Sequence, residues 1–193
     1  MVSLDLGCGK NKHPGAIGLD MNPGLCDVDV VSEVDGRKSE SPYLPFRDNS
    51  FDTIYMTDFI EHIQDIPWLL SEVHRVAEPE AIVEIRYPHY SSRYSYSDVT
   101  HVKKLGLRAF EHFDPSTDHG EMYQYYTYFG RRFPYKIEKT SVEFHDLRIH
   151  LNVSTVSRIS RAIYNLVRRD NYETFFAHLL PIGNVTLEMR VIK

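Results

Sequence analysis

The chain has 193 residues, of which 42% are hydrophobic and 25% charged, close to the average for globular proteins. This excludes a disordered tail and a collagen-like rod, and the length predicts a single domain over residues 1–193. No stretch approaches the ~20 apolar residues of a membrane span. The N-terminus lacks a signal peptide's basic region and apolar core, and two cysteines cannot form a disulfide framework or a cysteine-based zinc site. We therefore expect a cytoplasmic protein without membrane contact.

The formal net charge is −5, so general affinity for nucleic acid through a basic surface is not expected. Residues 20–65 hold eleven Asp/Glu and three Lys/Arg, whereas residues 131–169 hold nine Lys/Arg and three Asp/Glu. This asymmetry indicates either an anionic acceptor near the C-terminal segment or two differently solvated faces, and we favour the second interpretation.

The first half alternates short apolar runs with helical patterns, which is typical of parallel βαβ units. Apolar runs predict strands over residues 2–6, 16–20, 27–31, 51–57 and 81–85. The clearest helix begins after Asp65 as N-cap, carries Pro67 in its first turn, and repeats apolar residues at i, i+3, i+4 and i+7 up to Ala77.

The second half differs in composition. Residues 87–133 carry eight of the thirteen tyrosines. Beyond them, a strand is predicted over residues 135–145, extended by or paired with residues 147–153. Helical spacing follows over residues 156–167 and 172–179, and residues 185–191 alternate as in an amphipathic strand near a sheet edge. These patterns predict a parallel core finished by antiparallel strands.

An apolar strand stops in a Gly-x-Gly turn at Leu4-Asp5-Leu6-Gly7-Cys8-Gly9. Glycines there let the backbone turn sharply and let a ligand approach closely. Asp20 closes the next strand, where a carboxylate can accept both hydroxyls of a ribose. A Gly-x-Gly turn alone is weak evidence, but the ordered set of motifs along this chain is much stronger.

That ordered set comprises LDLGCG at residues 4–9, GLD at 18–20, LPFRDNSFD at 44–52, EHI at 61–63 and EVHRV at 72–76. In this combination the chain resembles the class I S-adenosylmethionine-dependent methyltransferases, over about residues 2–90. The resemblance implies an α/β, Rossmann-like sheet that is mostly parallel, with an antiparallel C-terminal strand, and S-adenosylmethionine as the cofactor.

The resemblance also implies which residues hold the cofactor's methionine and ribose. Asp5 would accept the methionine ammonium, in part through water. Gly7, Cys8 and Gly9 would pass beneath the methionine and the ribose. Asp20 would bind the ribose hydroxyls.

Other residues would lie at the adenine and the acceptor. Met21 would flank the adenine, and Glu33 would lie near its amino group. Asp58 and Phe59, at the end of the fourth strand, would face the methionine moiety and the acceptor. His62 would join them, or it would only cap and pack the following loop and helix.

The chain departs from the family in two places. Only six residues, Lys10 to Gly15, separate Gly9 from Ala16, whereas a parallel crossover normally needs a dozen or more. This shortened first crossover should run as a loop, because six extended residues span roughly 20 Å. Glu78-Pro79-Glu80 stands where the family often has Pro-Gly-Gly, which changes a turn before the fifth strand.

We divide the domain into a cofactor-binding half, residues 1–86, and two inserts, residues 87–134 and 150–184, that cover the acceptor. The first insert is the Tyr/His-rich segment after the fifth strand. Its tyrosines between Tyr87 and Tyr128 form an aromatic acceptor pocket, a dimer surface or ordinary core. A homo-oligomer is therefore left open.

Two histidines are candidate catalytic groups. His89 lies just past the fifth strand, at the carboxyl edge where open α/β sheets place ligands, and His101 is the next candidate. Either would act as a general base or contact the acceptor. The alternative for His89 is a structural hydrogen bond in a loop. The group His112, Asp114, Asp118 and His119 fits no known ligand spacing, so no metal is expected.

The sequence thus predicts an enzyme that methylates oxygen or nitrogen of a small or saccharide-like metabolite. An RNA or other nucleic-acid methyltransferase is the alternative among enzymes. The Asn/Asp-Pro-Pro-aromatic motif of exocyclic-amine methyltransferases is missing at Asp58-Phe59, but four arginines keep this alternative open: Arg158, Arg161, Arg168 and Arg169. A third hypothesis is a non-catalytic, methyltransferase-like subunit that supports a partner. It is motivated by the shortened crossover.

Overall fold

The computed structural model describes residues 2–24, 28–34, 44–144, 153–167 and 171–193, with the backbone alone over residues 153–157. Its centre is a seven-stranded sheet in the order β3-β2-β1-β4-β5-β7-β6. The strands are β1 Ser3–Leu6, β2 Ile17–Asp20, β3 Val30–Val31, β4 Phe51–Thr57, β5 Ala77–Pro88, β6 Tyr135–Phe144 and β7 Ile182–Val191. β7 is antiparallel to β5 and β6, and the pairs from β3 to β5 are parallel. The predicted fold class is confirmed.

Most predicted strands appear close to their expected bounds, and the differences have local causes. Asp27, His145 and Leu147–Asn152 lie outside the described residues, so the expected extension or pairing over residues 147–152 falls outside the structure. Val153 begins a helix, and β6 pairs with β7. β5 begins four residues early, at Ala77. The expected turn at residues 78–80 is instead a register shift inside the strand, where Glu80 adopts a left-handed φ of 65°.

The first crossover is a loop, as predicted. Residues 7–16, all of them described, contain no helix between the parallel strands β1 and β2. The buried carboxylate of Asp5 accepts a hydrogen bond from the His13 backbone N–H at 2.8 Å. The His13 ring stacks on Tyr55 of β4, with ring centroids 3.9 Å apart. These two contacts hold the short loop against the strands without a helix.

The longest helix of the first half is α1, Ile66–Val76, and its Asp65 cap accepts from the Trp68 N–H at 2.9 Å. The other helical segments within the described ranges are η1 Ile60–His62, α2 Tyr94–Ser97, η2 Glu111–Phe113, α3 Asp118–Tyr123, η3 Tyr125–Gly130, α4 Val153–Leu166 and the π-turn η4 Tyr172–Phe176. α4 and η4 thus agree with the two helical patterns predicted for the C-terminal half.

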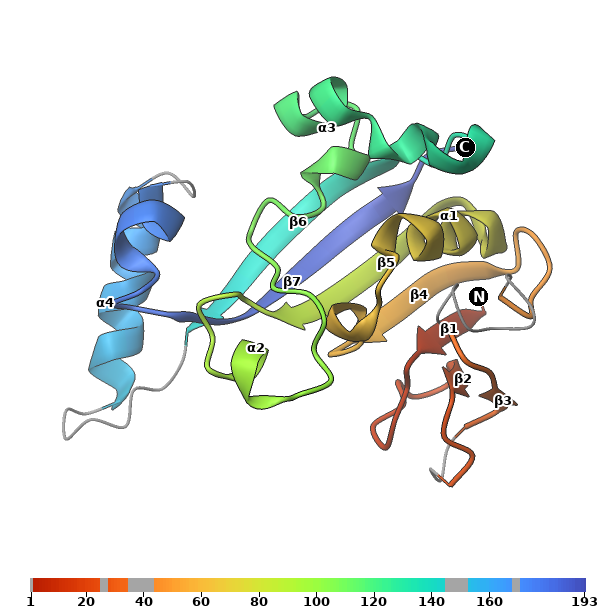
Figure 1. The fold of residues 1–193 in the computed structure, drawn as a ribbon, viewed down its shortest axis with the longest axis horizontal. Helices are drawn as coiled ribbons and strands as arrows, with labels where there is room; N and C mark the ends of the chain where they lie inside the picture. Colours follow the sequence, from red (N-terminus) through yellow and green to blue (C-terminus); the bar gives the residue numbers. More distant parts are fainter. Residues whose placement is uncertain (1, 25–27, 35–43, 145–152, 168–170) are drawn as a thin grey trace.

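The helical segments pack mainly on one face of the sheet. Figure 1 shows α1 and the segment that carries α3 in front of the strands, and α4 beyond the end of β6 and the start of β7. Burial alternates along β5, where Val83 and Ile85 are inaccessible and Glu84 and Arg86 are partly exposed. The core therefore lies between one face of the sheet and the helices that cover it.

Candidate functional site

A cavity of about 510 Å³ lies at the carboxyl ends of β1, β2 and β4. β2 and β4 flank β1 on opposite sides, so the direction in which successive strands are added to the sheet reverses at β1. Open α/β sheets bind ligands at such a switch point. The volume is within the usual range for small-molecule sites. Seven residues predicted from the sequence line this cavity: Gly7, Asp20, Met21, Glu33, Asp58, Phe59 and His62.

The turn after β1 requires glycine for two reasons. Gly7 adopts a left-handed φ of +69°, and a Cβ on it would lie 2.1 Å from the Phe59 ring. Gly9 also has a positive φ, and its N–H donates to Asp20 Oδ2 at 3.0 Å. The Gly-x-Gly turn is therefore held against the end of β2 and against the residue that follows β4.

The Asp20 carboxylate is held in place from both sides. Oδ2 accepts the Gly9 N–H at 3.0 Å, and Oδ1 accepts the Asn22 N–H at 2.9 Å. A carboxylate oxygen can accept more than one hydrogen bond, so both oxygens keep capacity toward a ligand. The two carboxylate oxygens of Asp20 are thus held in a fixed orientation in the cavity wall, where both can accept hydrogen bonds from a ligand.

The cavity is acidic. Asp20, Glu33 and Asp58 contribute carboxylates to its wall. Asp58 follows β4 in a left-handed conformation with φ 51°, and its Oδ2 pairs with Arg86 at 2.5 Å. One arginine against three carboxylates leaves a negative field, which favours a cationic ligand.

The other three predicted cofactor residues lie behind this wall. Asp5 is 2% exposed, and burial raises the pKa of its carboxyl despite the His13 N–H bond. Cys8 is a buried free thiol, and its pKa is raised first by burial and then by Asp5 and Asp20. Gly9 reaches the site through its bond to Asp20. The structure thus uses Asp5 to hold the crossover loop.

His89 is placed differently from the catalytic role considered for it. Its side chain is fully buried, and Nε2 lies 2.8 Å from Glu173 Oε1. Nδ1 accepts the Ser91 N–H at 3.2 Å and contacts Ser91 Oγ at 2.8 Å. Both ring nitrogens are engaged and His89 is not in the cavity wall, so the geometry corresponds to the structural alternative and not to a base or acceptor contact.

His101, the second candidate, lies beside the cavity. Its ring centroid is 4.7 Å from that of His62, which lines the wall together with Thr100. His101 Nδ1 is 3.3 Å from the Ser95 carbonyl oxygen. Burial, followed by the neighbouring His101, lowers the pKa of His62.

Glu61 is a residue that sequence reasoning missed as a site residue. It is 1% exposed, and neither carboxylate oxygen has a hydrogen-bond partner among the described residues. Burial raises its pKa to about 7, and Asp58 adds to the shift. His101 Nε2 lies 3.7 Å from Glu61 Oε1. The EHI motif contained the signal, since Glu61 immediately precedes His62.

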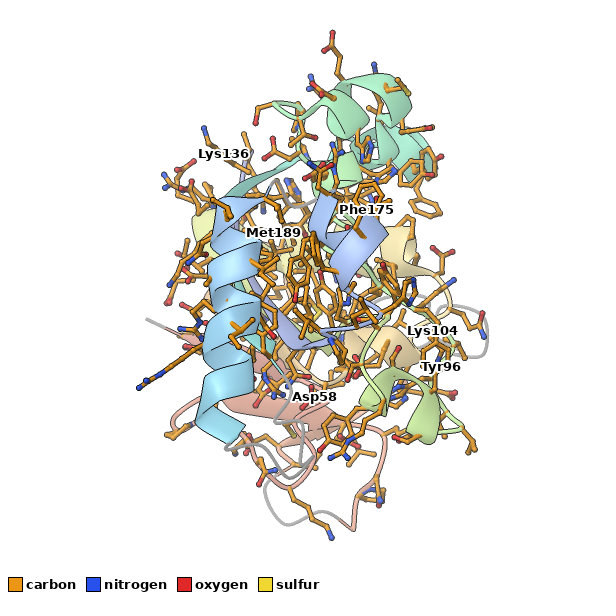
Figure 2. The ribbon with its side chains drawn as sticks, turned by 90° about the vertical axis from the view of Figure 1, so that its left-hand side faces the viewer. Asp58, Tyr96, Lys104, Lys136, Phe175 and Met189 are labelled. Atoms are coloured by element: carbon orange, nitrogen blue, oxygen red, sulfur yellow. The ribbon has the colours of Figure 1, made fainter. Side chains whose placement is uncertain are left out.

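The Tyr/His-rich insert reaches the cavity wall through Thr100 and not through a tyrosine of the described chain. Tyr87 is fully buried and donates to the Gly106 carbonyl at 3.0 Å, whereas Tyr96 is 65% exposed. Lys104 lies over the Tyr96 ring at 4.9 Å, and Figure 2 shows the two residues next to each other at the lower right. The tyrosines thus divide between core and surface.

Part of the chain is similar in sequence to known proteins. Residues 4–85 match the family model described as "Methyltransferase domain". A curated relative, "Arginine-hydroxylase NDUFAF5, mitochondrial" of Danio rerio, is 25% identical over 92 residues, which are 42% of this chain and 29% of the relative. The matched region therefore spans less than a third of that relative's length.

Solved structures resemble the fold over nearly the whole chain. An S-adenosylmethionine-dependent methyltransferase from Archaeoglobus fulgidus is 19% identical with a TM-score of 0.53, covering 98% of this chain and 85% of its own. YcgJ from Bacillus subtilis is 15% identical with a TM-score of 0.54, covering 100% and 92%. A chain of the Haloferax volcanii complex between the Trm112 methyltransferase activator and a methyltransferase is 15% identical with a TM-score of 0.56, covering 100% and 83%.

The fold is that of the class I methyltransferases. The family match and the fold together support the predicted S-adenosylmethionine-dependent methyltransferase, with S-adenosylmethionine as its cofactor. No helix in the described part of the chain is long and apolar enough to cross a membrane. The fold does not supply the acceptor, which has to be argued from the site.

Proposed function

We propose that the cavity at the carboxyl ends of β1, β2 and β4 binds S-adenosylmethionine, and that the enzyme moves its methyl group to oxygen or nitrogen of a small or saccharide-like metabolite. The observation that carries this proposal is the convergence of Gly7, Asp20 and Asp58, from three different strand ends, on one acidic cavity. S-adenosylmethionine carries a sulfonium and an ammonium, and both cations suit this field.

Each wall residue has a task in this proposal. Asp20, held by two backbone N–H groups, accepts the two ribose hydroxyls. Met21 and Glu33 flank the adenine. Phe59 packs on Gly7 and shapes the floor beneath the methionine, and Asp58 faces the methionine moiety. These side chains hold the sulfonium methyl in a fixed direction.

The acceptor approaches from the side that the insert after β5 contributes. Methyl transfer is an in-line displacement, so the site must hold the nucleophile about 3–3.5 Å from the methyl carbon. Thr100 is the insert residue in the wall, and His62 lies next to it. No Lys or Arg lines the described wall, which favours an uncharged, small acceptor over a polyanionic one.

Two alternatives remain as proposals. A nucleic-acid methyltransferase would use Arg158 and Arg161, which lie outside the cavity wall, and Arg168 and Arg169, which lie outside the described residues. A non-catalytic subunit is favoured by the use of Asp5 to hold the crossover loop. A matched relative is named a hydroxylase, so similarity over this region does not by itself define the reaction.

Calorimetric titration with S-adenosylmethionine and S-adenosylhomocysteine tests the proposal. We expect one site per chain, and we expect Asp20→Ala to weaken binding by ~30-fold, or about 2 kcal/mol, because two hydroxyls lose a charged acceptor. Asp118→Ala, an exposed carboxylate at the start of α3, is the matched control. Circular dichroism verifies that each variant folds. No binding by folded wild-type protein would instead support the non-catalytic subunit.

A further inference from the structure

Three metal-ligating side chains meet beside the cavity. Glu61 and His62 belong to η1, directly after β4, and His101 comes from the insert after β5. One ligand atom from each lies within 4.8 Å of the others. The group joins two segments 40 residues apart in sequence, and no metal motif in the sequence predicts it.

Glu61 is the unusual member of this group. Buried polar groups in proteins are almost always hydrogen-bonded, and leaving one without a partner costs free energy. Glu72, equally buried, shows the usual solution: it accepts from Arg75, Arg131 and the Leu44 N–H. Glu61 has no such donors within the described chain. An ion would supply the missing positive charge.

The two histidines are held in a way that suits metal ligands. His62 Nδ1 lies 3.0 Å from Thr100 Oγ1, whose own hydroxyl hydrogen goes to Asp98 Oδ1 at 2.6 Å. Nδ1 of His62 must therefore donate, and Nε2 keeps its lone pair. In His101, Nδ1 faces the Ser95 carbonyl, which leaves Nε2 toward Glu61. Metal-binding histidines typically donate their other N–H to such outer partners.

We infer that Glu61, His62 and His101 form a site for a divalent transition-metal ion, with Zn²⁺ the best match. Two imidazoles and one carboxylate are a common set for catalytic zinc, which keeps its fourth position open. Bond lengths of about 2.0–2.2 Å place ligands of a tetrahedral ion roughly 3.4 Å apart. The Glu61–His101 separation of 3.7 Å is close to this value, and all three ligand atoms lie within 4.8 Å of one another, so ion binding requires the ligands to draw together.

The position of the site defines what the ion would do, and this consequence rests on the proposed function. His62 and Thr100 line the cavity proposed for the cofactor, so an ion held by His62 would lie at the edge of that cavity, where a bound acceptor could reach its open position. A divalent ion lowers the pKa of a bound hydroxyl. The hydroxyl would lose its proton to solvent, and its oxygen would form the bond to the methyl carbon. The carbon–sulfur bond would break, leaving S-adenosylhomocysteine. The acceptor atom is then oxygen and not nitrogen.

This inference replaces the expectation of no metal, and titration of metal-free protein with ZnCl₂ tests it. We expect one Zn²⁺ per chain and an upward shift of the melting temperature. Glu61→Gln and His101→Asn should weaken binding at least tenfold and abolish the shift. His119→Asn is the matched control, because His119 also contacts a glutamate, with Nδ1 3.6 Å from Glu111 Oε2, but lies outside the cavity wall. Equal zinc affinity in wild type and Glu61→Gln would overturn the site.

A parallel titration with S-adenosylhomocysteine separates the two proposals. Zinc binding without S-adenosylhomocysteine binding would retain the metal site and contradict the proposed function. S-adenosylhomocysteine binding without zinc binding would support the proposed function and overturn the metal site. We expect the Glu61→Gln variant to bind S-adenosylhomocysteine, which shows that its loss of zinc does not come from misfolding.

Discussion

Two histidine–glutamate contacts of the described chain, His89–Glu173 and His101–Glu61, differ in how fully their polar atoms are hydrogen-bonded. His89 Nε2 lies 2.8 Å from Glu173, and the other ring nitrogen is bonded to Ser91. His101 Nε2 lies 3.7 Å from Glu61, whose carboxylate has no hydrogen-bond partner in the described chain. The first pair is satisfied and the second is not.

The difference shows how to distinguish a structural pair from a functional one. Glu173 also accepts the Leu107 N–H at 2.9 Å, so the first pair joins the insert to η4, far apart in sequence. The second pair leaves charge and lone pairs next to the cavity at the carboxyl ends of β1, β2 and β4, where His62 and Thr100 form part of the wall. A fully bonded pair stabilises the fold, whereas an unsatisfied pair is available to bind a ligand.

The largest effect on the free energy of unfolding is expected from disrupting the hydrogen-bonded His89–Glu173 pair. His89→Ala deletes an inaccessible ring and leaves Glu173 Oε1 with the Leu107 N–H but without the imidazole, so the free energy of unfolding should fall by roughly 3–5 kcal/mol. Urea denaturation measures the loss. The exposed His178→Ala should change it by less than about 0.5 kcal/mol. A loss below about 1 kcal/mol for His89→Ala would remove the structural assignment.

The next effect concerns Glu61 and depends on pH. Its pKa is raised from 4.5 to about 7 in the folded protein, so the folded state binds more protons than the unfolded state between these values. The free energy of unfolding of wild-type protein in EDTA should therefore fall as pH rises through this window, by roughly 2–3 kcal/mol. Glu61→Gln cannot ionise and should not show this decline.

Thermal melts from pH 4.5 to 8.5 compare the two proteins. We expect Glu61→Gln to melt at the higher temperature above pH 7, and the two curves to converge toward pH 4.5. Parallel curves at all pH values would show that the Glu61 carboxylate is not destabilised by its burial.

The smallest effect on the free energy of unfolding is expected from replacing His101, the histidine that faces Glu61. His101→Asn removes a 3.3 Å contact to the Ser95 carbonyl and a 3.7 Å approach to Glu61, neither of them a strong hydrogen bond. In metal-free protein the free energy of unfolding should fall by about 1 kcal/mol. A loss as large as that of His89→Ala would mean that the two pairs are equally structural.

Local patterns were sufficient for much of the fold, and the family resemblance supplied the residues of the cavity wall. The strand at residues 51–57, the helix capped by Asp65 and the glycine turn after β1 all follow from periodicity and from residues close in sequence. Seven of the ten predicted cofactor residues line one cavity, because the carboxyl ends of parallel strands meet at one edge of the sheet.

The sequence by itself thus determined the fold class and, through the family resemblance, most residues of the cavity proposed to bind the cofactor. Only the tertiary structure decided which histidine is buried in a closed pair and which faces an unsatisfied carboxylate. The partners of His89 and Glu61 come from segments 84 and 40 residues away, Glu173 and His101. Hydrophobic periodicity reports which face of an element is buried, but the satisfaction of a polar group depends on which distant side chain arrives there.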